Sequence, residues 1–154
     1  MALFLSTYTN KVDKKGRVSV PANFRAALQK EEFHGVVVYG SFVNECIESC
    51  GMARMARLSE SIDSLDPYSE ERDAFAATIL GGSSQLPFDG EGRVILPEAL
   101  MQETGITDKA VFVGKGATFE IWSPVAFEKY SAKAKELAKQ ERAKLRLTPG
   151  KESK

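Results

Sequence analysis

The chain has 154 residues, and its 21 basic and 21 acidic side chains give a formal net charge of zero. This balance excludes a protein-wide field that attracts polyanions, so any nucleic-acid-binding face has to be local. The length suits one domain or two small halves that share a core, and a hydrophobic fraction of 43% is enough to fill it. No apolar run approaches the roughly 20 residues of a membrane span, and no signal-peptide pattern is present. These features predict a cytoplasmic protein without membrane attachment.

A nine-residue stretch occurs twice in the chain and organises the rest. Residues 13–21 and 89–97 share Asp, Gly, Arg, Val and Pro in the same order, at a constant offset of 76 positions. Residues 37–49 and 111–123 also match, at an offset of 74, and the slip of two residues falls in the loop between. We therefore interpret the chain as a tandem duplication and look for function in what each copy displays.

The first half is predicted to contain a strand, a polar turn, a second strand, a helix and a β-hairpin. Alternating or β-branched residues are typical of the strands, and Asp and Gly favour the turn. Pro21 fits the first position of the helix, whose inward face carries Phe24, Ala27 and Leu28. The predicted segments are strands at 3–9 and 17–20, the turn at 10–16, a helix ending near residue 30 or 31, and hairpin strands at 36–39 and 45–48.

Two further helices are predicted between the halves. The first spans residues 51–62. The second begins at Asp66-Pro67, with Asp as the N-cap and Pro at the first helical position, and it ends at Gly81-Gly82. The apolar residues assigned to these two helices are Met52, Met55, Ala56, Leu58, Phe75, Ile79 and Leu80.

The second half repeats the order of the first. Gly105 is expected to close its short helix, and Ser123-Pro124 repeats the pattern of an N-cap followed by Pro. That pair predicts a long, strongly basic helix with a narrow apolar stripe. The predicted segments are a strand at 83–88, hairpin strands at 109–114 and 118–122, the long helix at 125–147 and a disordered tail at 148–154.

Each repeated turn carries an Arg directly after a Gly, with an Asp four residues earlier. Arg17 and Arg93 enter a strand, so each guanidinium lies on a rigid support within reach of Asp13 or Asp89. One interpretation is that each pair only closes its loop as a partly exposed ion pair, which contributes little. The other is a contact with phosphates and base edges, which needs clustered Lys and Arg because Arg binds guanine through two hydrogen bonds.

The charges of the two copies differ and favour the first copy as the DNA contact. The second copy sets Arg93 against Asp89 and Glu91, whereas the first sets four cations against one Asp. The predicted DNA-binding residues are Lys11, Asp13, Lys14, Lys15 and Arg17, with Asp89 and Arg93 as the second copy of the motif.

Two copies of Asp-x-x-Gly-Arg-Val-x-x-Pro, each followed by a short helix and a hairpin, resemble the MraZ family, whose members carry two AbrB-like motifs in one chain. The resemblance covers about residues 3–130. It implies an α+β fold, an internally duplicated AbrB-like β-barrel with additional helices, in a ring-forming subunit. The expected parts are a first AbrB-like repeat at 1–50, linking helices at 51–82, a second AbrB-like repeat at 83–123, a C-terminal helix at 124–147 and a disordered tail at 148–154.

The resemblance also implies a function. Members of the family are cytoplasmic, nucleoid-associated bacterial regulators that bind repeated sites in the promoter of the division and cell-wall gene cluster, which includes their own gene. The family's Asp-x-x-x-Arg motif, implicated in DNA contact, falls on Asp13 and Arg17 and again on Asp89 and Arg93. The expected partners are double-stranded DNA and further copies of the chain, in a ring of eight or more subunits. No cofactor, metal or enzymatic activity is expected.

A ring supplies a mechanism for one modestly basic loop. Each neutralised phosphate adds a salt-sensitive increment to binding. Several identical loops on one face of a ring can engage several repeated sites at once, which raises the effective affinity by ~10²–10⁴ without new contacts. We therefore expect the first-copy turns to enter the major groove at successive repeats, where the bound ring blocks or redirects polymerase.

Two rival classes of function stay open. One is an enzyme, because Gly40-Ser41 and Gly82-Ser83 are pairs of the kind that a self-processing decarboxylase cleaves. The other is a partner-binding module, antitoxin-like or a purely structural ring, without DNA readout.

Three further features also have alternative interpretations. Cys46 and Cys50 are interpreted as buried small hydrophobes, although a redox or metal role is an alternative, and His34 is expected at the surface. The basic C-terminal helix is either a second DNA contact or a helix that packs on the body or on a neighbouring subunit.

Overall fold

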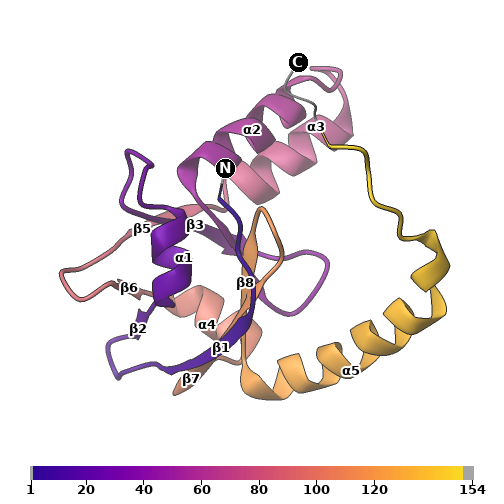
Figure 1. Cartoon of the computed structure of the whole chain (residues 1–154). Coiled ribbons are helices and arrows are strands. Elements are labelled where there is room, and N and C mark those ends of the chain that lie inside the picture. The colour runs from indigo at the N-terminus through magenta and orange to yellow at the C-terminus, as the bar shows by residue number, and fades with distance from the viewer. Residues whose placement is uncertain (1, 151–154) are drawn as a thin grey trace.

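The structure is a computed structural model that describes residues 2–150 (Figure 1). Within this range an antiparallel sheet is combined with five α-helices in a mixed α/β architecture. The first elements are β1 (Thr7–Lys11), β2 (Arg17–Ser19), α1 (Ala22–Ala27), β3 (Gly35–Gly40), β4 (Ile47–Cys50), α2 (Met52–Asp63) and α3 (Glu70–Phe75), which continues as a π-helical segment (Ala76–Leu80). They are followed by β5 (Ser84–Pro87), β6 (Arg93–Ile95), α4 (Glu98–Thr104), β7 (Lys109–Gly114), β8 (Phe119–Trp122), α5 (Pro124–Gln140) and a 3₁₀ turn (Arg142–Lys144).

The strands of the two halves are interlocked. Six strands form one sheet in the order β1-β7-β8-β4-β3-β5, and β2 and β6 form a separate two-stranded ribbon. The first strand of each half pairs with the hairpin of the other half, β1 with β7 and β5 with β3. Lys11 lies opposite Lys109 in the first pairing, and Pro87 lies opposite Gly35 in the second. Pro87 comes 76 positions after Lys11, and Lys109 comes 74 positions after Gly35, so the two pairings are equivalent in the duplicated halves. Neither half could form these strand pairs alone.

The main core lies where the sheet meets α1 and the ribbon. Its centre is a group of four fully buried phenylalanines, namely Phe4, Phe24, Phe112 and Phe119. The ring centroids of Phe4 and Phe24 each lie 4.9 Å from that of Phe119. Val18 and Val94 point into this cluster from the ribbon and are each 1% exposed. Burial of an apolar side chain contributes roughly 1.5–3 kcal/mol, so the two valines anchor the ribbon on the body.

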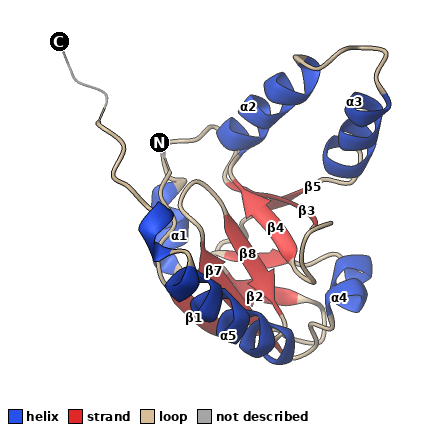
Figure 2. Cartoon of the chain, turned by 90° about the vertical axis from the view of Figure 1, so that its right-hand side faces the viewer, coloured by secondary structure: helices blue, strands red, loops and turns tan. Residues whose placement is uncertain are grey.

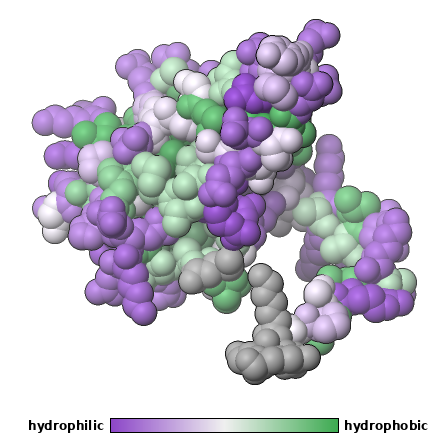
Figure 3. All heavy atoms as spheres, turned by 90° about the horizontal axis from the view of Figure 1, so that it is seen from above, coloured by the Kyte–Doolittle hydropathy of each residue, from purple (hydrophilic) through white to green (hydrophobic). Residues whose placement is uncertain are grey.

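Three of the helices occupy opposite ends of the molecule. α2 and α3 lie at one end and α5 crosses the other (Figures 1 and 2). Seen from the α2–α3 end, hydrophilic side chains cover the periphery and a more hydrophobic band crosses the middle (Figure 3). α5 packs on the sheet through its first turns, where the ring of Tyr130 stacks on Trp122 with centroids 4.4 Å apart. Among residues 2–150, no helix combines the length and the apolar character needed to cross a bilayer.

Several predicted boundaries are confirmed because a local signal sets them. Ser123 caps α5 by accepting a hydrogen bond from the Ala126 N–H at 3.1 Å, and Pro124 occupies the first position. Gly105 ends α4 with a left-handed φ of +74°. The strand at 109–114 has the predicted limits.

The prediction for the first strand and the first helix was wrong at their ends. β1 covers residues 7–11 rather than 3–9, because Ser6 adopts a φ of +78° that interrupts the extended chain. Phe4 instead makes an isolated bridge with Gly116 and turns into the core. α1 ends at Ala27 rather than near residue 30 or 31, because the N–H of Leu28 donates to the Arg25 carbonyl in a tighter turn.

The predicted start of the second linking helix was also wrong. Asp66 accepts a hydrogen bond from the Tyr68 N–H at 3.0 Å and closes a turn with Pro67. Ser69 is the actual N-cap, because its Oγ accepts from the Arg72 N–H at 3.1 Å, and α3 begins one residue later. Of the apolar residues assigned to the linking helices, Ala56 and Phe75 are exposed, since they lie outside the cluster of Val37, Cys50, Met55, Ile62 and Ile79.

The C-terminal helix is shorter than predicted. α5 ends at Gln140 and gives way to the 3₁₀ turn at 142–144, rather than continuing to residue 147. Leu137 is 58% exposed, so the distal turns gain little from packing, and helical propensity alone supports them weakly. Residues 148–150 carry no helix or strand, and the rest of the predicted disordered tail, 151–154, lies outside the described residues.

Candidate nucleic-acid interface

The first repeated turn is closed around the carboxylate of Asp13. Its Oδ1 accepts hydrogen bonds from the backbone N–H groups of Lys15 (3.0 Å) and Arg17 (2.9 Å). Its Oδ2 accepts one from Arg17 Nε at 2.6 Å. Gly16 has a φ of +83°, a conformation that favours glycine, and its N–H donates to the Asp13 carbonyl at 3.0 Å. The turn therefore holds the guanidinium by its Nε side, and the Arg17 side chain remains 34% exposed.

The second turn repeats this network bond for bond. Asp89 Oδ1 accepts from the N–H groups of Glu91 (2.8 Å) and Arg93 (2.9 Å), and Oδ2 accepts from Arg93 Nε at 2.8 Å. Gly92 has a φ of +75°. The difference lies in Glu91, whose carboxylate is 3.8 Å from Arg93 Nη1 and partly compensates its charge.

The two turns meet on one ribbon. In the β2–β6 pair, Val18 lies opposite Val94, and both side chains face the core. The alternation of strand residues then places Arg17, Ser19, Arg93 and Ile95 on the outer face. Arg17 is opposite Ile95, two residues from Arg93, and such diagonal neighbours lie roughly 7–8 Å apart. The sequence placed the two arginines in separate copies, whereas the fold places them on a single face.

Both ion pairs that the sequence suggested as loop closures are present. The N–H of Arg17, as the largest influence, holds the pKa of Asp13 below its ordinary value, and the N–H of Arg93 does the same for the pKa of Asp89. The hydrogen bond with Asp89 raises the pKa of Arg93. An exposed pair of this kind contributes little to stability, so its effect is to fix the guanidinium in place. Among the described residues, Arg17 Nη1 and Nη2 have no hydrogen-bonding partner.

The lysines predicted for the site lie around the first turn. Lys14 and Lys15 are exposed on the turn itself, and Lys11 is exposed at the end of β1. Its cross-strand neighbour is Lys109, a further cation at this edge that the sequence analysis did not assign. A groove of about 910 Å³ runs beside the turn, and Glu98 and Asp108 line it together with Lys14 and Lys15. The basic character is therefore concentrated on the exposed turn rather than in the groove.

Arg25 is a second cation that the sequence analysis did not assign. It extends from α1 across the second turn, where a Cβ at Gly92 would lie 2.7 Å from its Nε and Cζ atoms, and its Nε donates to the Val20 carbonyl at 3.0 Å. The corresponding residue in the other half, 76 positions on, is Met101, whose sulfur lies against Gly16. Arg25 therefore adds positive charge to the second turn, whose own positive charge is reduced by Glu91. An alignment of the two copies would have shown this residue as an Arg in the first copy where the second copy has a Met.

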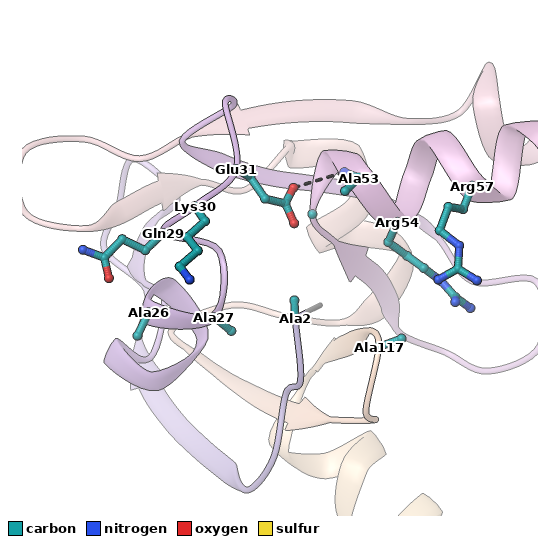
Figure 4. Close-up of a pocket in the computed structure, with 11 residues that line it drawn as sticks. Ala2, Ala26, Ala27, Gln29, Lys30, Glu31, Ala53, Arg54, Arg57 and Ala117 are labelled. Atoms are coloured by element: carbon teal, nitrogen blue, oxygen red, sulfur yellow. Dashed lines mark hydrogen bonds between the residues drawn. The ribbon is translucent and has the colours of Figure 1, made fainter. Parts of the chain in front are cut away.

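A basic cavity lies away from the ribbon, between α1 and the start of α2 (Figure 4). Its volume is about 540 Å³, and Lys30, Arg54 and Arg57 supply its positive charge. Glu31 Oε1 accepts a hydrogen bond from the Ala53 N–H at 3.1 Å, so a carboxylate of the chain itself already satisfies the first turn of α2.

The two cysteines and the histidine lie where the sequence predicted. Cys46 and Cys50 are buried, and His34 is exposed. Burial raises the pKa of the Cys50 thiol to about 11 and raises the pKa of Cys46 as well, so both hold their protons at neutral pH.

Comparison with known proteins adds an independent finding. The model of the family described as "MraZ protein, putative antitoxin-like" matches residues 3–50 and 79–147. The chain is 58% identical over 146 residues to the Transcriptional regulator MraZ of Rickettsia felis, a match that covers 95% of this chain and 98% of that protein. It is 57% identical over 149 residues to the protein of the same name from Rickettsia bellii, covering 96% and 99%. The corresponding protein of Rickettsia canadensis is 56% identical over 146 residues, with coverage of 95% and 98%.

Proposed function

Because the chain belongs to the MraZ family, whose compared members are named transcriptional regulators, we propose that it regulates transcription by binding double-stranded DNA through the outer face of the β2–β6 ribbon. The observation that carries this proposal is the pair of arginines on one ribbon, each oriented by an Asp through the same set of hydrogen bonds. A two-stranded ribbon fits the major groove, which is ~12 Å wide, and an oriented Arg suits the two acceptors of guanine.

The first turn is the principal contact in this proposal. Lys11, Lys14 and Lys15 surround Arg17 with charges suited to phosphates, which determine affinity and orientation, while the guanidinium contacts base edges. Asp13 is an orienting residue rather than a DNA ligand. Arg93, together with Arg25, makes a weaker second contact because Glu91 lies beside it.

The proposed assembly is a homo-oligomeric ring of eight or more subunits that presents several ribbons to repeated promoter sites. Simultaneous binding by several subunits would raise the effective affinity by ~10²–10⁴. This gain would compensate for weak binding by each single loop in a chain of zero net charge. The proposed targets are the promoter of the chain's own gene and the division and cell-wall cluster, bound at the nucleoid in the cytoplasm. The interlocked pairing of the halves supports an origin by duplication of one AbrB-like unit.

The test is the binding of a fluorescent duplex, carrying the promoter upstream of the chain's own gene, across a salt series. Arg17→Ala should weaken binding by roughly 1–3 kcal/mol, about 5- to 150-fold in Kd. Lys14→Ala should weaken binding to all sequences and reduce the salt slope by about 1. Arg57→Ala on α2 removes the same charge away from the ribbon and serves as the matched control.

Light scattering on each variant shows whether the oligomer is intact. Loss of binding by Arg93→Ala but not by Arg17→Ala would reverse the roles of the two turns. A wild-type chain without salt-dependent binding would sink the DNA proposal and favour an antitoxin-like or structural partner-binding module.

A further inference from the structure

A polar cluster lies on the face of the sheet turned away from the main core. Ile47 and Ile121 point into that core, and the alternation of strand residues sends their neighbours Glu48 and Glu120 to the other face. The two glutamates are directly opposite each other in the β4–β8 pair. Cys46, directly before β4, joins them there, in contact with the cluster around Trp122. Cys46 is 1% and Glu120 is 5% exposed, while Glu48 is half-buried.

The side chains of these three residues converge. Cys46 Sγ and one carboxylate oxygen from each glutamate all lie within 4.8 Å of one another. Zinc–ligand distances of ~2.0–2.3 Å in tetrahedral geometry put the donor atoms of a bound ion roughly 3.3–3.8 Å apart. Small side-chain adjustments therefore suffice to bring the three donors onto one ion.

The surrounding side chains already orient one of the donors. Trp122 Nε1 donates to Glu120 Oε1 at 2.9 Å, and Lys115 Nζ lies 3.2 Å from the same oxygen. Lys115 is itself held, because its ammonium donates to the Tyr130 hydroxyl at 2.7 Å and lies 4.9 Å from the centre of that ring. Both contacts fall on Oε1, which leaves Oε2 of Glu120 for another partner. Fixing a ligand through its second atom is the usual arrangement around a protein-bound metal.

The charges of the cluster favour a divalent cation. A bound metal would displace the proton of the Cys46 thiol, and the resulting thiolate and two carboxylates beside the Lys115 ammonium would sum to two negative charges in a largely buried place, where uncompensated charge is costly. One divalent cation brings that sum to zero. Thiolate and carboxylate donors together suit a borderline-soft ion, as Zn²⁺ is.

We propose that Cys46, Glu48 and Glu120 form a binding site for a divalent cation of the Zn²⁺ type. Three protein ligands leave one coordination position for water. Glu48 also lines an open cavity of about 230 Å³ with Ser41, Phe42 and Thr118, which gives the ion a route from solvent. A bound ion would join β4 to β8, one strand from each half, beside the Trp122–Tyr130 stack that attaches α5. This site is separate from the ribbon proposed for DNA.

The test is a titration of the reduced full-length chain with Co²⁺, which reports thiolate ligation by a charge-transfer absorption band in the near ultraviolet. The wild type should show the band, and Cys46→Ser should lose it. Cys50→Ser is the matched control, because Cys50 is a buried thiol at the end of β4, outside the cluster, and this variant should keep the band. Calorimetry with Zn²⁺ should show at least ~10-fold weaker binding for Glu48→Gln.

Circular dichroism shows whether Cys46→Ser folds. If it does not fold, Glu48→Gln still tests the proposal, because Glu48 is only half-buried. Absence of Zn²⁺ binding by the wild type would overturn the proposal. So would a band that survives Cys46→Ser, a band lost in Cys50→Ser, or unchanged Zn²⁺ affinity in Glu48→Gln.

Discussion

Replacing Gly16 by Ala should strain the first repeated turn in two ways. The residue has a φ of +83°, and an L-residue held in the left-handed region costs roughly 1–2 kcal/mol. The added Cβ would also lie 3.2 Å from the backbone carbonyl oxygen of Leu96, which cannot rotate away as a side chain could. Relief requires a shift of the strands where the Leu96 N–H donates to the Gly16 carbonyl at 2.9 Å.

Weakening a hydrogen bond of this kind costs roughly 0.5–1.5 kcal/mol. The two effects together predict a loss of about 1.5–3.5 kcal/mol in the free energy of unfolding. The DNA proposal adds that binding should fall as well, because the same turn fixes the Arg17 guanidinium.

The matched control is Gly90→Ala in the second turn. A Cβ at Gly90 would meet no atom within 4 Å, and the corresponding residue of the first turn is already a side-chain-bearing Lys14. This variant should stay within about 0.5 kcal/mol of the wild type. Urea unfolding followed by circular dichroism, at one fixed protein concentration, measures both variants. If Gly90→Ala lost as much stability as Gly16→Ala, the conformational argument would be refuted.

Two further predictions concern the turn carboxylates and the attachment of α5. The pKa values of Asp13 and Asp89 are lowered in the folded chain, so their contribution to stability is fully present above the ordinary value of 3.8 and is lost as the pH falls through the lower folded value. Carboxyl NMR should therefore show both groups ionised from pH 5 to 8, with midpoints below 3.8; a higher midpoint would contradict the network. Tyr130→Ala removes the ring stacked on Trp122, the single tryptophan of the chain, and should shift its fluorescence to longer wavelength. Leu137→Ala, at a position 58% exposed on the same helix, should leave the emission unchanged.

Local signals in the sequence determined where both repeated turns lie and where some helices begin and end. The duplicated motif located both turns, and the positive φ of Gly16 and Gly92 agrees with the role assigned to glycine there. Gly105 and Ser123-Pro124 set the end of α4 and the start of α5. These features depend on hydrogen bonds and dihedral preferences within a few residues, so a short stretch of sequence is enough to predict them. The family resemblance, based on the same motif, is confirmed by the comparisons.

Where local signals compete, the sequence alone misplaced the boundary. Asp66 and Ser69 are both good capping residues, and the first formed a turn with Tyr68 while the second capped α3. The basic periodic stretch after Tyr130 predicted a helix to residue 147, but packing ends earlier and so does α5.

Only the tertiary structure decided which distant segments meet. The exchange of strands between the halves brings Arg17 and Arg93 onto one ribbon, and it lays Arg25 of one half over Gly92 of the other. It also sets Glu48 opposite Glu120 across two hairpins. Such partners lie 67 to 76 positions apart in the chain, and strand pairing selects them by the burial of whole faces rather than by any short pattern. The sequence therefore determined the parts of the site, and long-range packing determined how they are combined.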